Sequence, residues 1–361
     1  MDPEPCRESA KATLVAHSKL PQEVIDHSLG FLYNDKDALA NCSLVSRQWS
    51  SFSQRVLFDS TRVTLKSVDH LNDFIQFLTA FHGSSRIRKL KLTDHRNIGV
   101  GCDARVVLCP IHMVPRILEL LPGLQSFKII YTMIGCECNS ELDEGIEEEQ
   151  TTRGPFSLKK LSVHDIMGST SDVIAFLNVF DNIGTLDCMR TYRGILSTDP
   201  SLEAQPRSIG IHAIRHYACD PEELLYPILR LQPCASQLQQ VIIELEVAMA
   251  AAFSKFVSQI PNLRHLDLSP NMKAGDDDEG SEDGDVEPAS WSLLDLSGCS
   301  SLRSFALRFY PVSVSLDDDS EVHDRCRQYV RDASEILLRL PQTVSQITFG
   351  IHIPPLLPTS H

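Results

Sequence analysis

The sequence has no long hydrophobic run. None of its stretches approaches the roughly 20 apolar residues that a membrane-spanning helix requires. The first nineteen residues include Asp2, Glu4 and Lys11 and contain no apolar segment, so they lack the hydrophobic core of a secretory signal peptide. The sequence therefore predicts no membrane association.

Motifs that carry enzymatic chemistry are also missing. There is no Gly-x-Ser-x-Gly nucleophile turn, no His-Glu-x-x-His helix and no phosphate-binding loop, and the thirteen histidines are scattered. Cys136 and Cys138 have no second cysteine pair at zinc spacing. Cys102, Cys109 and His112 form an incomplete ligand set. We expect no catalytic residue, no metal site and no cofactor.

The eleven cysteines are odd in number and irregularly spaced, which does not indicate a disulfide framework. Without a signal peptide they are expected to be reduced and mostly buried. This pattern predicts a cytoplasmic address, a nuclear address or both.

Positive charge is scarce, with 33 Lys and Arg against 48 Asp and Glu. Glu137 to Glu149 contains seven carboxylates and Asp276 to Glu287 contains eight, which together equal the net charge of −15. This balance excludes nucleic acid as the main partner. The acidic stretches, near 137–150 and 275–288, are expected to be solvated loop insertions. For the second, the alternative is a tether for a basic partner or a phosphorylation site at Ser281.

Residues 20–60 have the pattern of three short helices. Pro21 stands at the start of the first, where the missing N–H of proline costs nothing. Apolar residues then recur at helical spacing until Asn34 and Asp35 interrupt the pattern. Two more stretches with the pattern of short helices follow. A module of this size buries only a small apolar core. Apolar surface that remains exposed would therefore be covered by a partner. Residues 1–19 are expected to be a flexible N-terminus.

A motif of apolar-x-x-apolar-x-apolar returns at irregular intervals across residues 61–353, which indicates internal repeats. The nine copies that we count share this spacing and are centred on Ile87-Leu90-Leu92, Leu124-Phe127-Ile129, Leu158-Leu161-Val163, Ile183-Leu186-Cys188, Pro206-Ile209-Ile211, Leu238-Val241-Ile243, Leu263-Leu266-Leu268, Leu302-Phe305-Leu307 and Val344-Ile347-Phe349. The poorest copies are those at Ile183 and Pro206. Residues 354–361 would form a C-terminal tail.

Amphipathic helical stretches lie between the copies, at residues 68–81, 113–121, 171–180, 222–231, 247–260 and 322–340. A strand followed by a helix, many times over, predicts an α/β solenoid whose strands form a parallel inner sheet. The irregular period indicates insertions in the loops.

Three blocks of residues 20–60 resemble the F-box. They are Leu20-Pro21-Gln22-Glu23-Val24-Ile25, then Leu39-Ala40-Asn41-Cys42-Ser43-Leu44-Val45-Ser46-Arg47-Gln48-Trp49, then Val56-Leu57-Phe58. Their order and spacing match the motif across residues 20–58, and the continuation resembles fungal F-box proteins with degenerate leucine-rich repeats. The resemblance implies docking on a Skp-type adaptor, which connects to a cullin-RING scaffold in an SCF-type ubiquitin ligase. The repeat domain would then bind an unknown protein substrate.

The resemblance also implies an adaptor-facing set of apolar residues: Leu20, Pro21, Val24, Ile25, Leu29, Leu32, Leu44, Val45 and Trp49. A desolvated apolar and aromatic cluster is how interfaces gain affinity. The alternative is that about half of Leu29, Leu32, Leu44 and Trp49 form the module's own core. Gly30 departs from the motif and costs about 1 kcal/mol of helix stability relative to Ala.

Strand alternation places the residues between the apolar positions on the exposed face of the inner sheet. In the early repeats this face is basic, and the predicted substrate-binding residues are Lys89, Lys91, Lys128, Lys160 and His164. The functional interpretation is a groove for an acidic or phosphorylated segment. The alternative is an ordinary solvated face.

Two other functions stay open. One is a non-ligase scaffold or protein-interaction module that carries an F-box and repeats. The other is a hydrolase or transferase on a doubly wound sheet, which would need a glycine-rich first turn that the chain lacks.

Overall fold

The computed structural model describes residues 20–81, 83–94, 108–135, 156–168, 170–189, 192–193, 209–217, 228, 234–271, 291–309 and 319–351. The chain divides into two compact units, Met1–Asp59 and Ser60–His361. The predictions for residues 1–19, for both acidic insertions and for the C-terminal tail lie outside the described residues, as does the helix at 222–231 apart from Ile228.

The first unit contains three helices: α1 (Gln22–Gly30), α2 (Lys36–Val45) and α3 (Arg47–Asp59). Asp35 caps α2, because its carboxylate accepts a hydrogen bond of 2.9 Å from the backbone N–H of Ala38. Ser46 separates α2 from α3, and its Oγ lies 3.3 Å from the backbone nitrogen of Trp49. Short capped helices therefore follow one another with almost no loop between α2 and α3.

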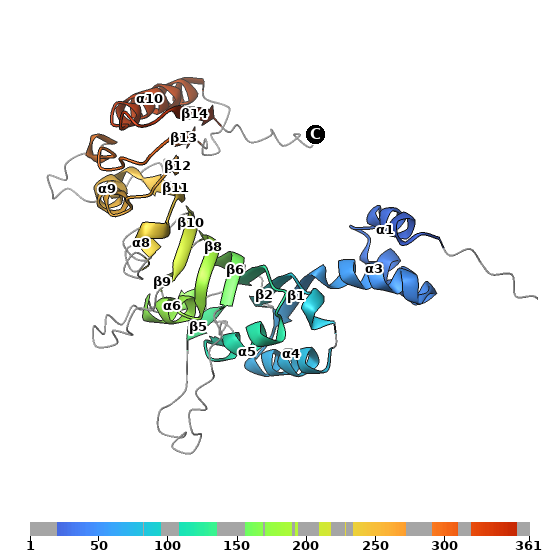
Figure 1. Cartoon of the computed structure of the whole chain (residues 1–361). Coiled ribbons are helices and arrows are strands. Elements are labelled where there is room, and N and C mark those ends of the chain that lie inside the picture. The colour runs from blue at the N-terminus through green and yellow to red at the C-terminus, as the bar shows by residue number, and fades with distance from the viewer. Residues whose placement is uncertain are drawn as a thin grey trace, which may run out of the picture. The chain divides into compact units, whose positions relative to one another are not determined.

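The second unit is built on a ten-stranded parallel sheet. Its strands are β1 (Ser60–Leu65), β2 (Lys89–Asp94), β4 (Ser126–Ile130), β6 (Phe156–His164), β8 (Phe180–Met189), β10 (Gly210–Tyr217), β11 (Gln240–Glu246), β12 (His265–Asn271), β13 (Ser304–Phe309) and β14 (Gln346–Ile351). They lie side by side in the order of the sequence, so the colours of Figure 1 run along the sheet from blue to red. The predicted α/β class with a large parallel sheet is confirmed.

The repeated apolar positions take equivalent places in this sheet. One column of paired residues consists of Leu90, Phe127, Leu161, Leu186, Ile214, Val241, Leu266, Phe305 and Ile347. The next consists of Leu92, Ile129, Val163, Cys188, His216, Ile243, Leu268, Leu307 and Phe349. Except at β14, where both side chains are half exposed, all of these side chains are buried. The strands from β2 to β13 in this sheet therefore contribute the same two positions to the core.

The copy predicted at residues 206–211 is wrong. Ile214 of β10 pairs with Leu186 of β8, so the equivalent triplet is Ile211-Ile214-His216. The last position of that triplet holds a fully buried histidine where the other copies have an apolar residue or cysteine. A search for apolar periodicity therefore missed this copy.

A small second sheet runs beside the first. It consists of β3 (Leu108–Pro110), β5 (Met133–Gly135), β7 (Met167–Gly168) and β9 (Tyr192–Arg193), all parallel. Tyr131 and Asp165 precede β5 and β7, and both have left-handed backbone conformations, with φ of 54° and 50°. The chain thus makes the same sharp turn in two successive repeats as it passes from the large sheet to the small one.

The helices of the second unit connect these strands: α4 (Val68–Ala80), α5 (Met113–Leu120), α6 (Thr170–Leu177), α8 (Cys234–Gln237), α9 (Ala250–Ser258) and α10 (Asp319–Leu337), with the 3₁₀ turns η1 (Ser84–Arg86), η2 (Val247–Met249) and η3 (Trp291–Leu293). Their apolar faces close the core. Phe176 of α6 packs between Phe127 and Phe180, with ring centroids 6.5 and 5.6 Å away.

No helix in the described part of the chain combines the length and the apolar character that crossing a membrane requires.

Candidate functional site

The first unit exposes five of the predicted apolar residues, Leu20, Pro21, Val24, Leu44 and Val45, which together we call the apolar patch. Leu44 and Val45 are 84% and 66% exposed at the end of α2. Leu20 and Val24, at the start of α1, are about half exposed. A small unit that leaves branched aliphatic side chains in water has surface available for a partner.

The other predicted adaptor-facing residues lie inside or beside the core of the unit. Ile25 and Leu29 are buried with Leu39 and Val56. Leu32 and Trp49 are partly buried and pack against this core. The structure therefore divides the predicted set into an exposed group and a group that supports the fold.

Hydrogen bonds hold the exposed group in place. The side-chain amide of Gln48 in α3 donates a hydrogen bond of 2.7 Å to the carbonyl oxygen of Leu20. This bond connects the first motif block to the second across 28 positions of sequence. Pro21 stands at the N-cap of α1, and its carbonyl accepts from the backbone N–H of Val24 at 3.1 Å. The segment that carries Leu20 is therefore ordered.

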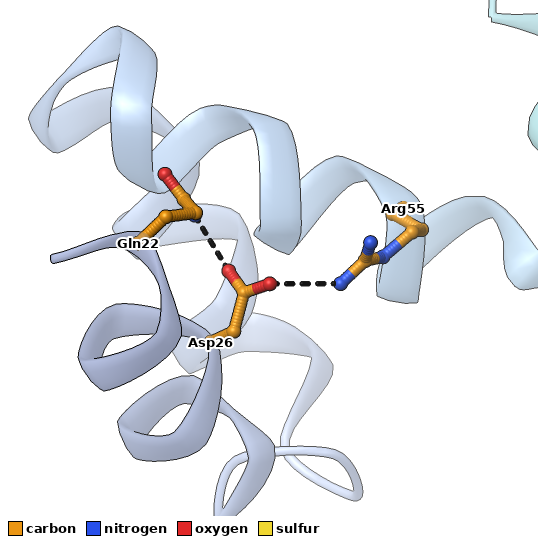
Figure 2. Close-up of polar contacts among 3 residues, drawn as sticks. All are labelled: Gln22, Asp26 and Arg55. Carbon is orange, nitrogen blue, oxygen red and sulfur yellow. Dashed lines mark hydrogen bonds and ion pairs between the residues drawn. The ribbon is translucent and has the colours of Figure 1, made fainter.

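Asp26 connects α1 to α3 by its two carboxylate oxygens (Figure 2). Oδ1 accepts a hydrogen bond of 2.6 Å from Gln22, one turn earlier in α1. Oδ2 lies 3.2 Å from a guanidinium nitrogen of Arg55 in α3. The ion pair therefore links α1, which carries Val24, to α3.

Two exposed aromatic residues were not predicted as part of this surface. Phe31 is 80% exposed and Tyr33 is 50% exposed in the turn between α1 and α2. Phe31 makes an edge contact with the ring of His27, at a centroid distance of 5.2 Å. Gly30 precedes them, and a side chain there would meet nothing within 4 Å. Their position directly after Gly30, a residue type that weakens a helix, was the sequence signal that they could lie outside the helical core.

In the second unit, the parallel register lines up cations on the polar face of the large sheet. Arg62 of β1 pairs with Lys91 of β2, and Lys91 pairs with Lys128 of β4. We call these three residues the cationic row. Arg62 was not predicted, because β1 precedes the first copy of the repeat that we counted. Lys89 lies on the same face of β2, two residues before Lys91, and is exposed.

The cationic row is not neutralised within the described part of the chain. None of its three side chains forms an ion pair there. Burial lowers the pKa of Lys128, and the neighbouring charge of Lys91 lowers it further. Asp187 and, more weakly, Asp165 oppose this effect. Like charges in adjacent strands destabilise a sheet, so the row retains electrostatic energy that an anion would relieve.

The other two predicted residues of this face converge on a carboxylate instead. Lys160 Nζ lies 2.7 Å from Asp187 Oδ2, and His164 Nε2 lies 3.6 Å from the same oxygen. The hydroxyl of Ser162 donates to that oxygen at 3.3 Å. Burial raises the pKa of Asp187, but His164 and Lys160 outweigh it and hold the pKa well below its ordinary value. Lys160 and His164 are thus engaged with Asp187, which the sequence did not reveal.

Charges on the later strands of the same face compensate one another. Asp267 of β12 forms an ion pair of 2.8 Å with Arg308 of β13. Burial raises the pKa of Asp267, while Arg308 and Arg215 lower it in part. On β10, Arg215 stands in the register between Asp187 and Asp267, whereas the cations of β1, β2 and β4 are adjacent with no carboxylate between them in the register.

Metal-ligating side chains do not cluster in the part of the chain that the structure describes. Cys109 is buried, and burial raises the pKa of its thiol to about 12. Cys102, Cys136 and Cys138 lie outside the described residues.

No protein-family model matches the chain, and no curated protein matches it.

Proposed function

We propose that the protein is the substrate-recognition subunit of an SCF-type ubiquitin ligase. Its first unit is an F-box that docks on a Skp-type adaptor through the apolar patch. Its second unit is an irregular leucine-rich-repeat-like solenoid that binds a protein substrate. Such a receptor needs no catalytic residue of its own, because it acts by holding the substrate near the conjugating enzyme.

The observation that carries the proposal is the exposure of apolar motif residues in the first unit. Leu20, Val24, Leu44 and Val45 come from two separate motif blocks, and all four are exposed. Other residues of the same unit supply its core and the hydrogen bond to Leu20. Exposed apolar residues that the fold itself does not need are best explained by an obligate partner.

The sheet order supports the solenoid part of the proposal. Each strand of the large sheet lies beside the next one in the sequence, from β1 to β14. A doubly wound enzyme fold reverses its strand order at the point where its ligand binds. No such reversal occurs among the described strands, which favours stacked repeats over the hydrolase or transferase alternative.

The test is direct binding of the full chain to a purified Skp-type adaptor by isothermal titration calorimetry. A double variant, Leu44→Asp with Val45→Asp, places two charges in the apolar patch without touching the buried core. We expect its affinity to fall by at least about 30-fold, the loss typical of an interface hot spot. Because both wild-type side chains are exposed, the circular dichroism spectrum should stay unchanged.

The matched control is Leu338→Asp in the second unit. Leu338 is 83% exposed, which is the same as Leu44 to within one per cent. This variant should bind the adaptor like the wild type. Unchanged affinity of the Leu44 and Val45 variant would contradict the assignment of the apolar patch.

A further inference from the structure

We infer that the cationic row is a docking site for an extended, carboxylate-rich segment of a partner protein. This inference rests on the proposed function in one respect, since it names the class of substrate that the second unit would select. The row consists of Arg62, Lys91 and Lys128, which the register places in adjacent strands of the sheet.

Charge complementarity identifies the occupant as an anion. Three cations stand in neighbouring strands, and none has an ion-pair partner among the described residues. The next position of the same row is Ser162, and the one after it is Asp187, which is already occupied by Lys160. An incoming anion therefore meets no competing carboxylate along the row itself until β8.

The spread of the charge favours an extended chain over a single phosphoryl group. Neighbouring strands lie about 4.8 Å apart, so the row spans about 10 Å across β1, β2 and β4. Alternate side chains of an extended peptide are about 6.8 Å apart, which lets two or three carboxylates reach the flexible heads of the row together. A phosphoryl group concentrates its charge at one point and is best held by converging donors.

The size of the row argues against nucleic acid. A nucleic-acid site needs cations distributed along a much longer backbone of phosphates. Here the cationic stretch is bordered by Asp187, and beyond it carboxylates separate the cations, because Arg215 stands between Asp187 and Asp267 in the register and Asp267 pairs with Arg308. The row is therefore suited to a short acidic peptide.

The test uses the full chain and a fluorescent peptide of eight residues in which Glu alternates with Ser. Binding is measured by fluorescence polarisation at low ionic strength. In a double variant, Lys91→Gln with Lys128→Gln, the dissociation constant should rise about 10-fold, because two partly exposed ion pairs with the peptide are lost. Raising the salt concentration should weaken the binding of the wild type, since the contacts are partly exposed.

A charge-matched control removes two cations elsewhere in the second unit. Arg116→Gln in α5 with Lys255→Gln in α9 lowers the net charge by the same amount, and both of these side chains are exposed on helices. It should leave the dissociation constant within about twofold of the wild type. An equal loss in both double variants would overturn the inference, because binding would then follow net charge alone.

A second peptide separates the remaining outcomes. It carries one phosphoserine among neutral residues, and we expect it to bind more weakly than the Glu peptide. Tighter binding of the phosphopeptide, or no binding of either, would overturn the inference. Adaptor affinity, measured on the same variants, should not change, so that a failure here is distinguishable from a failure of the proposed function.

Discussion

His216 shows how one residue can depart from a repeat and still occupy its place. It pairs with Cys188 and Ile243 in the buried column, where β12 and β13 have Leu268 and Leu307. Both of its ring nitrogens are buried without a hydrogen-bond partner among the described residues. Burial lowers its pKa to about 4, so the folded protein holds this ring neutral.

This histidine predicts acid sensitivity. The unfolded chain takes up a proton near pH 6.5, whereas the folded chain does so only near pH 4. As the pH falls between these values, the unfolded state is favoured and stability is lost. Replacing His216 by Leu should therefore reduce the stability lost between pH 7.5 and pH 5.0 by about 2 kcal/mol.

The measurement is urea unfolding of both proteins at the two pH values. The control is Ile243→Leu, a substitution at the paired position of β11 that changes no titratable group and should leave the pH dependence as in the wild type. The same pH dependence in the His216→Leu variant and in the wild type would refute the account of this buried ring.

At the scale of the element, the strands were the most predictable feature. The apolar-x-x-apolar-x-apolar spacing located β2, β4, β6, β8, β11, β12, β13 and β14, since each buried position repeats the same contacts. Helix ends were predicted less well. The helix expected at 171–180 ends at Leu177, because Phe180 pairs with Phe156 as the first residue of β8.

The features of the site that the sequence did not predict depend on contacts between elements that are distant in the sequence. Asp187 of β8 is contacted by three residues of β6, namely Lys160, Ser162 and His164. The register between these two strands cannot be read from the sequence of either strand alone. In the first unit, the motif identified apolar residues but not which of them the core would take. Ile25 and Val24 are neighbours in sequence, yet only Ile25 is buried. Which of the two is buried depends on which side of α1 faces the other helices, and the motif does not specify this.

The last strand behaves differently from its neighbours. Ile347 and Phe349 of β14 are 55% and 50% exposed, whereas the paired Phe305 and Leu307 of β13 are fully buried. Phe305→Ala should therefore cost about 3–5 kcal/mol of stability. Ile347→Ala should cost about 1 kcal/mol, because half of its side chain already lies in water.

Urea titrations of the two variants give this comparison directly. Equal losses in both would show that β14 is covered as completely as β13, against the exposure that the structure gives it.

At the scale of the whole molecule, the two units present different kinds of surface. The first unit exposes aliphatic side chains, while the second carries the cationic row on the polar face of its large sheet. The net charge of −15 gave no sign of this row, because it averages over the acidic stretches at 137–149 and 276–287. Charge must be assigned to faces before it predicts a partner.

The most direct test of the central claim is affinity purification of the intact chain and of a chain without residues 1–59, each scored for a Skp-type adaptor and a cullin. We predict that both proteins accompany the intact chain and that neither accompanies the shortened one, because the apolar patch lies in the first unit. Recovery of the adaptor without a cullin would instead support the scaffold alternative. Absence of both from the intact chain, or equal recovery with both chains, would contradict the proposal that the first unit is a working F-box.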